Sequence, residues 1–97
     1  MTLEELKHSL SADSPPLGSP TLIQALWHDA KGNWHAAHQL AQSIDGEDGA
    51  WVHAYLHRKE GDHSNASYWY HRAGKPMPVL TLEDEWAMLV GELLTGH

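Results

Sequence analysis

The chain repeats a helix–turn–helix pattern at an offset of 29 residues, and this repeat restricts the possible folds more than any other feature. Residues 25–33 (ALWHDAKGN) align with residues 54–62 (AYLHRKEGD), with identities at Ala, His and Gly. In each copy Gly ends a helix and the following Asn or Asp caps the next one. Ala37 and Ala66 match farther along, where small side chains let two antiparallel helices approach closely. The sequence therefore predicts two tandem helical hairpins.

Residues Pro, Gly and Ser divide the rest of the chain into short segments. In none of these segments do apolar and polar residues alternate with the period of two that is typical of a strand. We expect an all-α fold with two antiparallel hairpins, an N-terminal capping helix and a C-terminal capping helix. The predicted single domain, 1–97, consists of a helix at 1–10, a linker at 11–20, hairpin one at 21–44, hairpin two at 50–73 and a last helix at 81–94. Residues 44–49 are predicted to form an acidic turn.

Composition excludes several classes of partner. Six Lys and Arg stand against 13 Asp and Glu, for a net charge of −7, so the clustered cations that bind nucleic acid or anionic membranes are missing. Without Cys there is no disulfide and no thiolate. No apolar run reaches membrane-spanning length, and the start MTLEELKHSL does not resemble a secretion signal. We therefore expect a cytoplasmic protein.

The second hairpin resembles the tetratricopeptide class of helical repeats. The residues that carry the resemblance are Ala54, Gly61, Asp62, Ala66, Tyr70, Ala73 and Pro78. The first hairpin departs from that pattern, because Ala41 stands where the family has an aromatic residue. The resemblance implies a right-handed stack of hairpins with a concave groove. The stretch from His53 to Gly74 also resembles a family of small proteins of uncharacterised function, which implies no mechanism.

Trp51, Tyr55 and Arg58 share one stripe of the helix that begins hairpin two. In the resembled fold this stripe lines the concave groove. Two aromatic rings and a guanidinium suit an extended peptide, an acidic segment or a planar small molecule. The leading hypothesis is therefore a noncatalytic interaction module that binds a protein, a peptide or a small ligand there. The alternative is that a neighbouring helix covers these residues as ordinary core.

His53 and His57 lie four residues apart on the same helix, with Glu60 one turn farther along. Paired His at this spacing can bind zinc or nickel, so the second hypothesis is a His-rich metal-binding protein. Ala54 follows His53 where a metalloprotease motif needs Glu, which excludes that enzyme class. The third ligand would be one of four other residues, namely His28, His35, His38 or His71. Without a metal, His53 and His57 would be half-buried structural imidazoles facing the partner helix.

No residue pattern predicts catalysis or a cofactor. Glu83, Asp84 and Glu85 look like paired carboxylates, but they occupy the first turn of the last helix, where the helix dipole alone favours negative charge. No phosphate-binding Gly loop or nucleophile motif is present. We therefore predict a protein that is not an enzyme.

The last helix carries apolar residues around much of its circumference. These residues are Trp86, Met88, Leu89, Val90, Leu93 and Leu94. A helix that buries only one side against its own chain would leave some of them exposed. The sequence therefore predicts a homodimer through the C-terminal helix.

Overall fold

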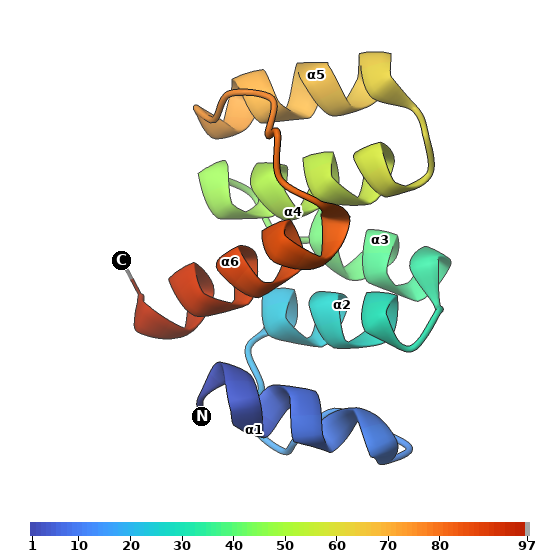
Figure 1. Cartoon of the computed structure of the whole chain (residues 1–97), viewed down its shortest axis with the longest axis vertical. Helices are drawn as coiled ribbons and strands as arrows, with labels where there is room; N and C mark the ends of the chain where they lie inside the picture. The colour runs from blue at the N-terminus through green and yellow to red at the C-terminus, as the bar shows by residue number, and fades with distance from the viewer. Residues whose placement is uncertain (97) are drawn as a thin grey trace.

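A computed structural model of the chain describes residues 1–96, and every regular element in this part of the chain is a helix (Figure 1). The elements are α1 (Leu3–His8), a 3-10 turn (Ser9–Ser11), α2 (Thr21–Ala30), α3 (Trp34–Gln42), α4 (Glu47–Lys59), α5 (His63–Ala73) and α6 (Leu82–Thr95). The all-α prediction is confirmed. Helices α2 and α3 form the first hairpin, and α4 and α5 form the second.

The two hairpin turns have the same construction. Gly32 and Gly61 adopt φ of +85° and +88°, a left-handed conformation that is cheap only for glycine. The next residue, Asn33 or Asp62, donates its backbone N–H to the carbonyl five residues earlier, at 2.8 and 3.0 Å respectively. Its side chain then accepts the N–H of the third residue beyond and caps the second helix. The repeated turns are therefore equivalent in structure as well as in sequence.

Helix α4 begins at Glu47, three residues before the predicted start of the second hairpin. Gly46 is the last non-helical residue, with φ of +97°. Glu47 and Asp48, assigned to a turn by the sequence analysis, instead form the first helical turn. Carboxylates are favoured there because they interact with the positive end of the helix dipole.

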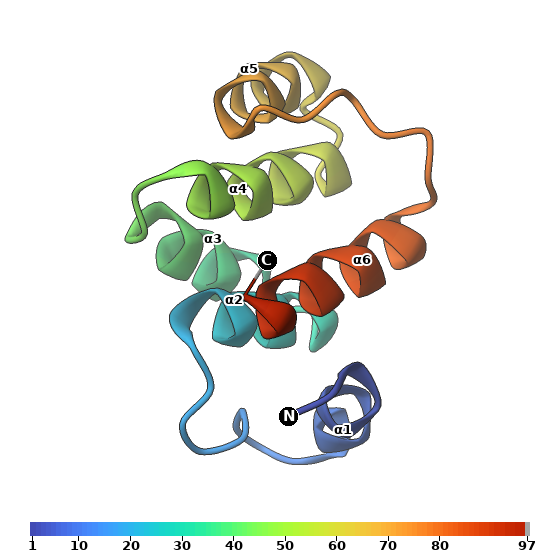
Figure 2. The ribbon, with the colours of Figure 1, turned by 90° about the vertical axis from the view of Figure 1, so that its left-hand side faces the viewer.

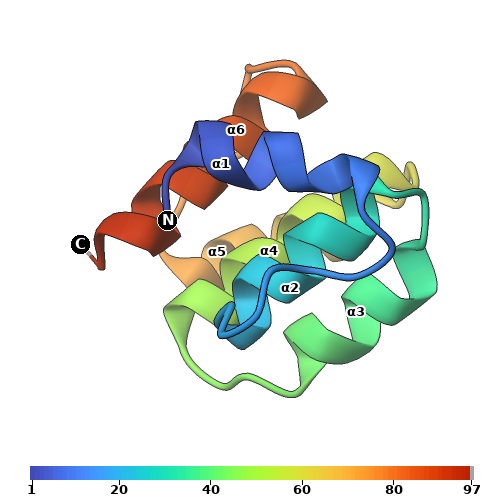
Figure 3. The same ribbon diagram turned by 90° about the horizontal axis from the view of Figure 1, so that it is seen from below.

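Helix α6 packs along the side of the two hairpins, where it contacts α2 and α4. Figure 2 shows α6 and α3 on opposite sides of the α2 and α4 pair. Trp86 is 7% exposed and its indole N–H donates to the Leu26 carbonyl at 2.9 Å, while Leu89 and Val90 are fully buried. Helix α1 also packs against α6, as Figure 3 shows. Half of the predicted apolar surface of α6 is thus used within the chain, whereas Met88 is 40% exposed and Leu93 and Leu94 are half-buried, so the homodimer stays a prediction.

A buried carboxylate fixes α6 against the second hairpin. Glu85 of α6 is 0% exposed. Its oxygens accept from Arg58 Nη1 at 2.7 Å, from the Tyr70 hydroxyl at 2.5 Å and from Trp51 Nε1 at 3.4 Å. Burial, followed by the hydrogen bond to Glu85, raises the pKa of the Tyr70 hydroxyl well above its usual range, so it stays a donor. The charge of Glu85 is therefore compensated by one cation and two neutral donors.

The N-terminal segment covers the outer side of α2. Leu6 of α1 is fully buried, the Trp27 indole N–H donates to Ser9 Oγ at 3.2 Å, and Lys31 Nζ donates to the Leu10 carbonyl at 2.6 Å. These contacts place α1 below α2 in Figure 1, so the first hairpin is capped as predicted. Within residues 1–96, none of the helices combines the length and apolar character needed to cross a bilayer.

We predict that Glu85→Ala destabilises the fold by about 3 kcal/mol, because it leaves the half-buried Arg58 guanidinium and the buried Tyr70 hydroxyl without their acceptor. The matched control is Glu83→Ala, which removes an exposed carboxylate from the same helical turn and is expected to cost less than about 1 kcal/mol. Urea denaturation followed by circular dichroism measures both. Equal losses in the two variants would contradict the role assigned to Glu85.

Candidate metal centre

Three histidines from two hairpins meet on the side of α4 opposite the Glu85 network. His53 and His57 lie one turn apart on α4, and His38 reaches them from α3. His38 Nε2 lies 2.8 Å from His53 Nε2, and each of the three residues offers one ring nitrogen within 4.8 Å of the others. His53 and His57 are each 7% exposed, and His38 is half-buried. The packing of α3 on α4 thus gathers three nitrogen donors that are far apart in sequence.

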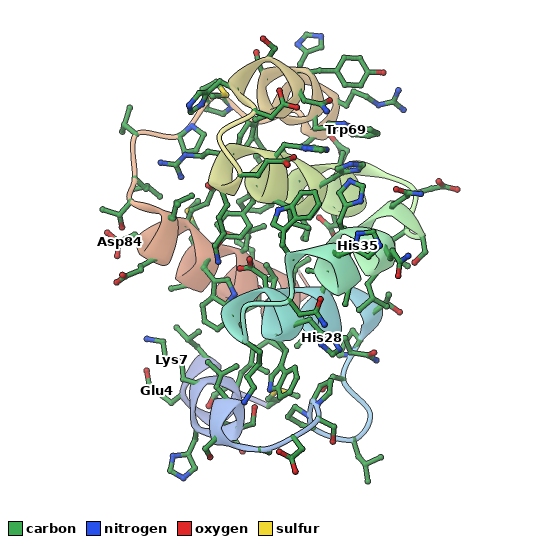
Figure 4. All side chains as sticks on the ribbon, turned by 90° about the vertical axis from the view of Figure 1, so that its right-hand side faces the viewer. Glu4, Lys7, His28, His35, Trp69 and Asp84 are labelled. Carbon is green, nitrogen blue, oxygen red and sulfur yellow. The ribbon has the colours of Figure 1, made fainter. Side chains whose placement is uncertain are left out.

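Two tryptophans hold the imidazole rings in place. The Trp69 ring stacks on His53, with centroids 4.0 Å apart and planes at 16°, and the Trp34 ring stacks on His38 at 4.8 Å. The Trp34 indole N–H donates to the Leu56 carbonyl at 2.7 Å, which anchors that ring on α4. Figure 4 shows Trp69 on α5 and His35 on α3 projecting on the same side of the molecule. The cluster therefore lies between α3 and α5, with aromatic walls that restrict the rotamers of its ligands.

A carboxylate orients the third ring. Glu60 Oε2 lies 2.6 Å from His57 Nδ1, on the same helix. A carboxylate accepts a hydrogen bond, so this contact places a proton on Nδ1, and the lone pair of the neutral ring is then on Nε2. A carboxylate that holds the far nitrogen of a histidine is the usual second partner of a metal-ligating imidazole.

Burial keeps two rings of the cluster uncharged. Desolvation, followed by the neighbouring His38 and His57, lowers the pKa of His53 from 6.5 to about 4. Desolvation, followed by the neighbouring His57, also lowers the pKa of His38, against a smaller opposing effect of Glu60. At neutral pH these two rings are therefore neutral, which is the protonation state that a metal ion requires of its histidine ligands.

One of the four histidines that the sequence left open lies beside His53 and His57 in the structure. His38 joins His53 and His57. His28 instead lies edge-on to Trp27 on α2, with ring centroids 5.1 Å apart. His35 and His71 are exposed on α3 and α5 and belong to no group of converging ligand atoms among the described residues.

The three residues predicted to line a binding groove are engaged by neighbouring helices, Trp51 and Arg58 by α6 and Tyr55 by α2. Trp51 and Tyr55 are 4% and 2% exposed. Arg58 donates to Glu85 and to the Leu80 carbonyl, and the Tyr55 hydroxyl donates to Asp29 Oδ2 at 3.1 Å. The alternative in which neighbouring helices use this stripe as core therefore describes most of it, while Tyr55 still lines part of a cavity of about 680 Å³ between α2, α4 and α6. The physical reason is that Glu85 of α6 satisfies the donors of Trp51 and Arg58, and Asp29 of α2 satisfies the hydroxyl of Tyr55.

Sequence reasoning missed two buried acids. Glu85 was assigned to the helix dipole, and Asp29 was not singled out, yet Asp29 is 2% exposed and accepts from Lys59 Nζ at 2.8 Å. A signal was present in the spacing: Glu85 lies four residues before buried Leu89, and Asp29 lies four residues after buried Ala25. Both acids therefore fall on the apolar stripe of their helix.

In comparisons with family models, curated proteins and solved structures, nothing matches this chain. The geometry of the site is accordingly the basis for a functional proposal.

We predict that acid destabilises the metal-free protein through His53. The unfolded chain binds a proton near pH 6.5, whereas folded His53 binds it only near pH 4. The contribution of His53 to the free energy of unfolding is therefore fully present above pH 6.5. It is lost as the pH is lowered toward 4, and the loss is about 3 kcal/mol for this residue. Urea denaturation in the presence of chelator at pH 7.5 and 4.5 measures the loss. His53→Gln is expected to reduce it and the exposed control His8→Gln to leave it unchanged; an unchanged loss in His53→Gln would contradict the assignment.

Proposed function

We propose that this protein binds one transition-metal ion through His38, His53 and His57. The observation that carries the proposal is the convergence of their three ring nitrogens within 4.8 Å. Imidazole nitrogen is a borderline-soft ligand that suits Zn²⁺, Ni²⁺ and Cu²⁺, whereas Ca²⁺ and Mg²⁺ prefer oxygen. Cu²⁺ should bind most tightly, following the general affinity order of these ions.

Small ring movements would complete the site. Nitrogens bound to a tetrahedral Zn²⁺ at about 2.0–2.1 Å are roughly 3.4 Å apart. The Nε2 atoms of His38 and His53 are 2.8 Å apart, so the two rings need to separate by a fraction of an ångström. His38 is half-buried on α3 and has the freedom for this adjustment. In the absence of metal, the same two nitrogens form a hydrogen bond between neutral rings, with one as donor and one as acceptor.

The bound ion would link the two hairpins. His38 belongs to the first hairpin, and His53 and His57 belong to the second. Because the three ligands converge only in the folded chain, an ion bound to them stabilises the folded state over the unfolded state.

The proposal is limited to binding. Glu60 is the carboxylate that contacts the cluster directly, and it is engaged by His57 Nδ1. The interaction-module hypothesis relied on Trp51, Tyr55 and Arg58, whose polar groups are already engaged by Glu85 and Asp29 within the chain. Metal binding is favoured because its ligands already converge.

We predict that Zn²⁺, Ni²⁺ and Cu²⁺ bind with a stoichiometry of one ion per chain, measured by isothermal titration calorimetry. A free metal concentration of 100 times Kd should stabilise the fold by about 2.7 kcal/mol, seen as a higher Tm. His38→Gln and His57→Gln should each abolish this stabilisation. Glu60→Gln should weaken binding about 10–100-fold, because it removes the carboxylate that orients His57.

The matched control is His35→Gln. His35 is exposed on α3 one turn before His38 and belongs to no converging group, so its replacement should leave the affinity and the stoichiometry unchanged. The proposal fails if none of the three ions raises the Tm, or if His35→Gln and His38→Gln weaken binding equally.

A further inference from the structure

The candidate metal centre supplies three ligands and not four. The group that converges with His38 and His53 within residues 1–96 contains only His57 as a further ligand. Glu60 contacts His57 at Nδ1, on the other side of the ring from Nε2. Trp34 and Trp69, which stack on two of the ligands, offer no metal donor. Structural zinc sites are closed by four protein ligands, whereas sites with three keep a position for water or an exogenous molecule.

A cavity of about 410 Å³ lies beside the cluster, between α3 and α5. His53 is the histidine of the cluster that lines it, together with Trp69 of α5 and the small residues Gly49 and Ala50 of α4. Figure 4 shows Trp69 projecting from α5 on this side of the molecule. A molecule of several heavy atoms can therefore lie against the ring of a proposed metal ligand.

The charge of the loaded site would favour a small anion. Three neutral imidazoles leave the full +2 charge on a bound divalent ion. Arg72 lines the cavity, with its guanidinium 5.4 Å from the Trp69 ring centroid. Asp45 and Glu47 also line it and disfavour multiply charged anions such as phosphate. A small carboxylate with a single negative charge is attracted by the bound ion and by Arg72, and it is repelled less by Asp45 and Glu47 than phosphate is.

We propose that the ion bound to His38, His53 and His57 keeps an exchangeable fourth position, and that small monocarboxylates reach this position from the cavity. This inference rests on the proposed metal binding and adds the class of ligand that the loaded site takes. The carboxylate replaces the water on the ion, and Arg72 provides a second positive charge on the wall of the cavity. No covalent step on the protein is involved.

The experiment uses the protein loaded with Co²⁺, whose visible absorption bands report on the coordination of the ion. Titration with acetate should shift these bands and reach saturation. Titration with imidazole, a neutral donor, should also shift them. Arg72→Gln should weaken acetate binding about 3–10-fold and leave imidazole binding unchanged. Lys75→Gln is the matched control, because Lys75 lies over Trp51, away from the cavity, and its replacement should change neither titration.

The possible failures are distinguishable. If Co²⁺ itself does not bind, the proposed function and this inference are both wrong. If Co²⁺ binds but neither acetate nor imidazole changes the spectrum, metal binding stands and the open position is refuted. A response to imidazole without one to acetate refutes the carboxylate class. An acetate affinity that is the same in Arg72→Gln and in the unaltered protein refutes the cavity as the place of binding.

Discussion

The structure depends on a carboxylate that has no contact with water. Glu85 is 0% exposed, and removing such a charge from water is compensated only if its oxygens are fully hydrogen-bonded. Its three donors, Trp51, Arg58 and Tyr70, come from both helices of the second hairpin. They can be satisfied together only when α6 lies along α4. One buried ion pair with two neutral donors thus specifies where the last helix packs, and Asp29, buried against Tyr55 and Lys59, adds a second such constraint beside it.

The position of α6 gives the two sides of α4 different roles. One side carries Trp51, Tyr55 and Arg58, which are engaged by α6 and α2, so its aromatic and cationic side chains are used in folding. The other side carries His53 and His57 and lies between α3 and α5, where His38 and Trp69 complete the cluster. Figure 2 shows this division, with α6 and α3 on opposite sides of the central helices. The histidines therefore lie on the side of α4 that the last helix does not contact.

The histidine cluster has several features that the proposed metal binding requires. Burial keeps His53 and His38 neutral, Glu60 directs the lone pair of His57, and stacked tryptophans limit ring rotation. The pair His53 and His57 could be predicted from the sequence, because a spacing of four residues on one helix brings side chains together locally. The third ligand could not be chosen among four histidines, because His38 comes from a different hairpin and its approach depends on how α3 packs on α4.

The sequence by itself determined the helices, the two hairpins and the turns that join them, because these depend on local chemistry. Gly32 and Gly61 tolerate positive φ, Asn33 and Asp62 cap the next helix, and small residues at matched positions permit close helix packing. The resemblance to tetratricopeptide repeats stays a prediction. Only the tertiary structure decided that α6 and α2 engage the residues of the predicted groove and that Glu85 is buried rather than a surface carboxylate near a helix start. The reason is that a charged residue is buried only where distant donors meet it, and one helix read alone does not contain those donors.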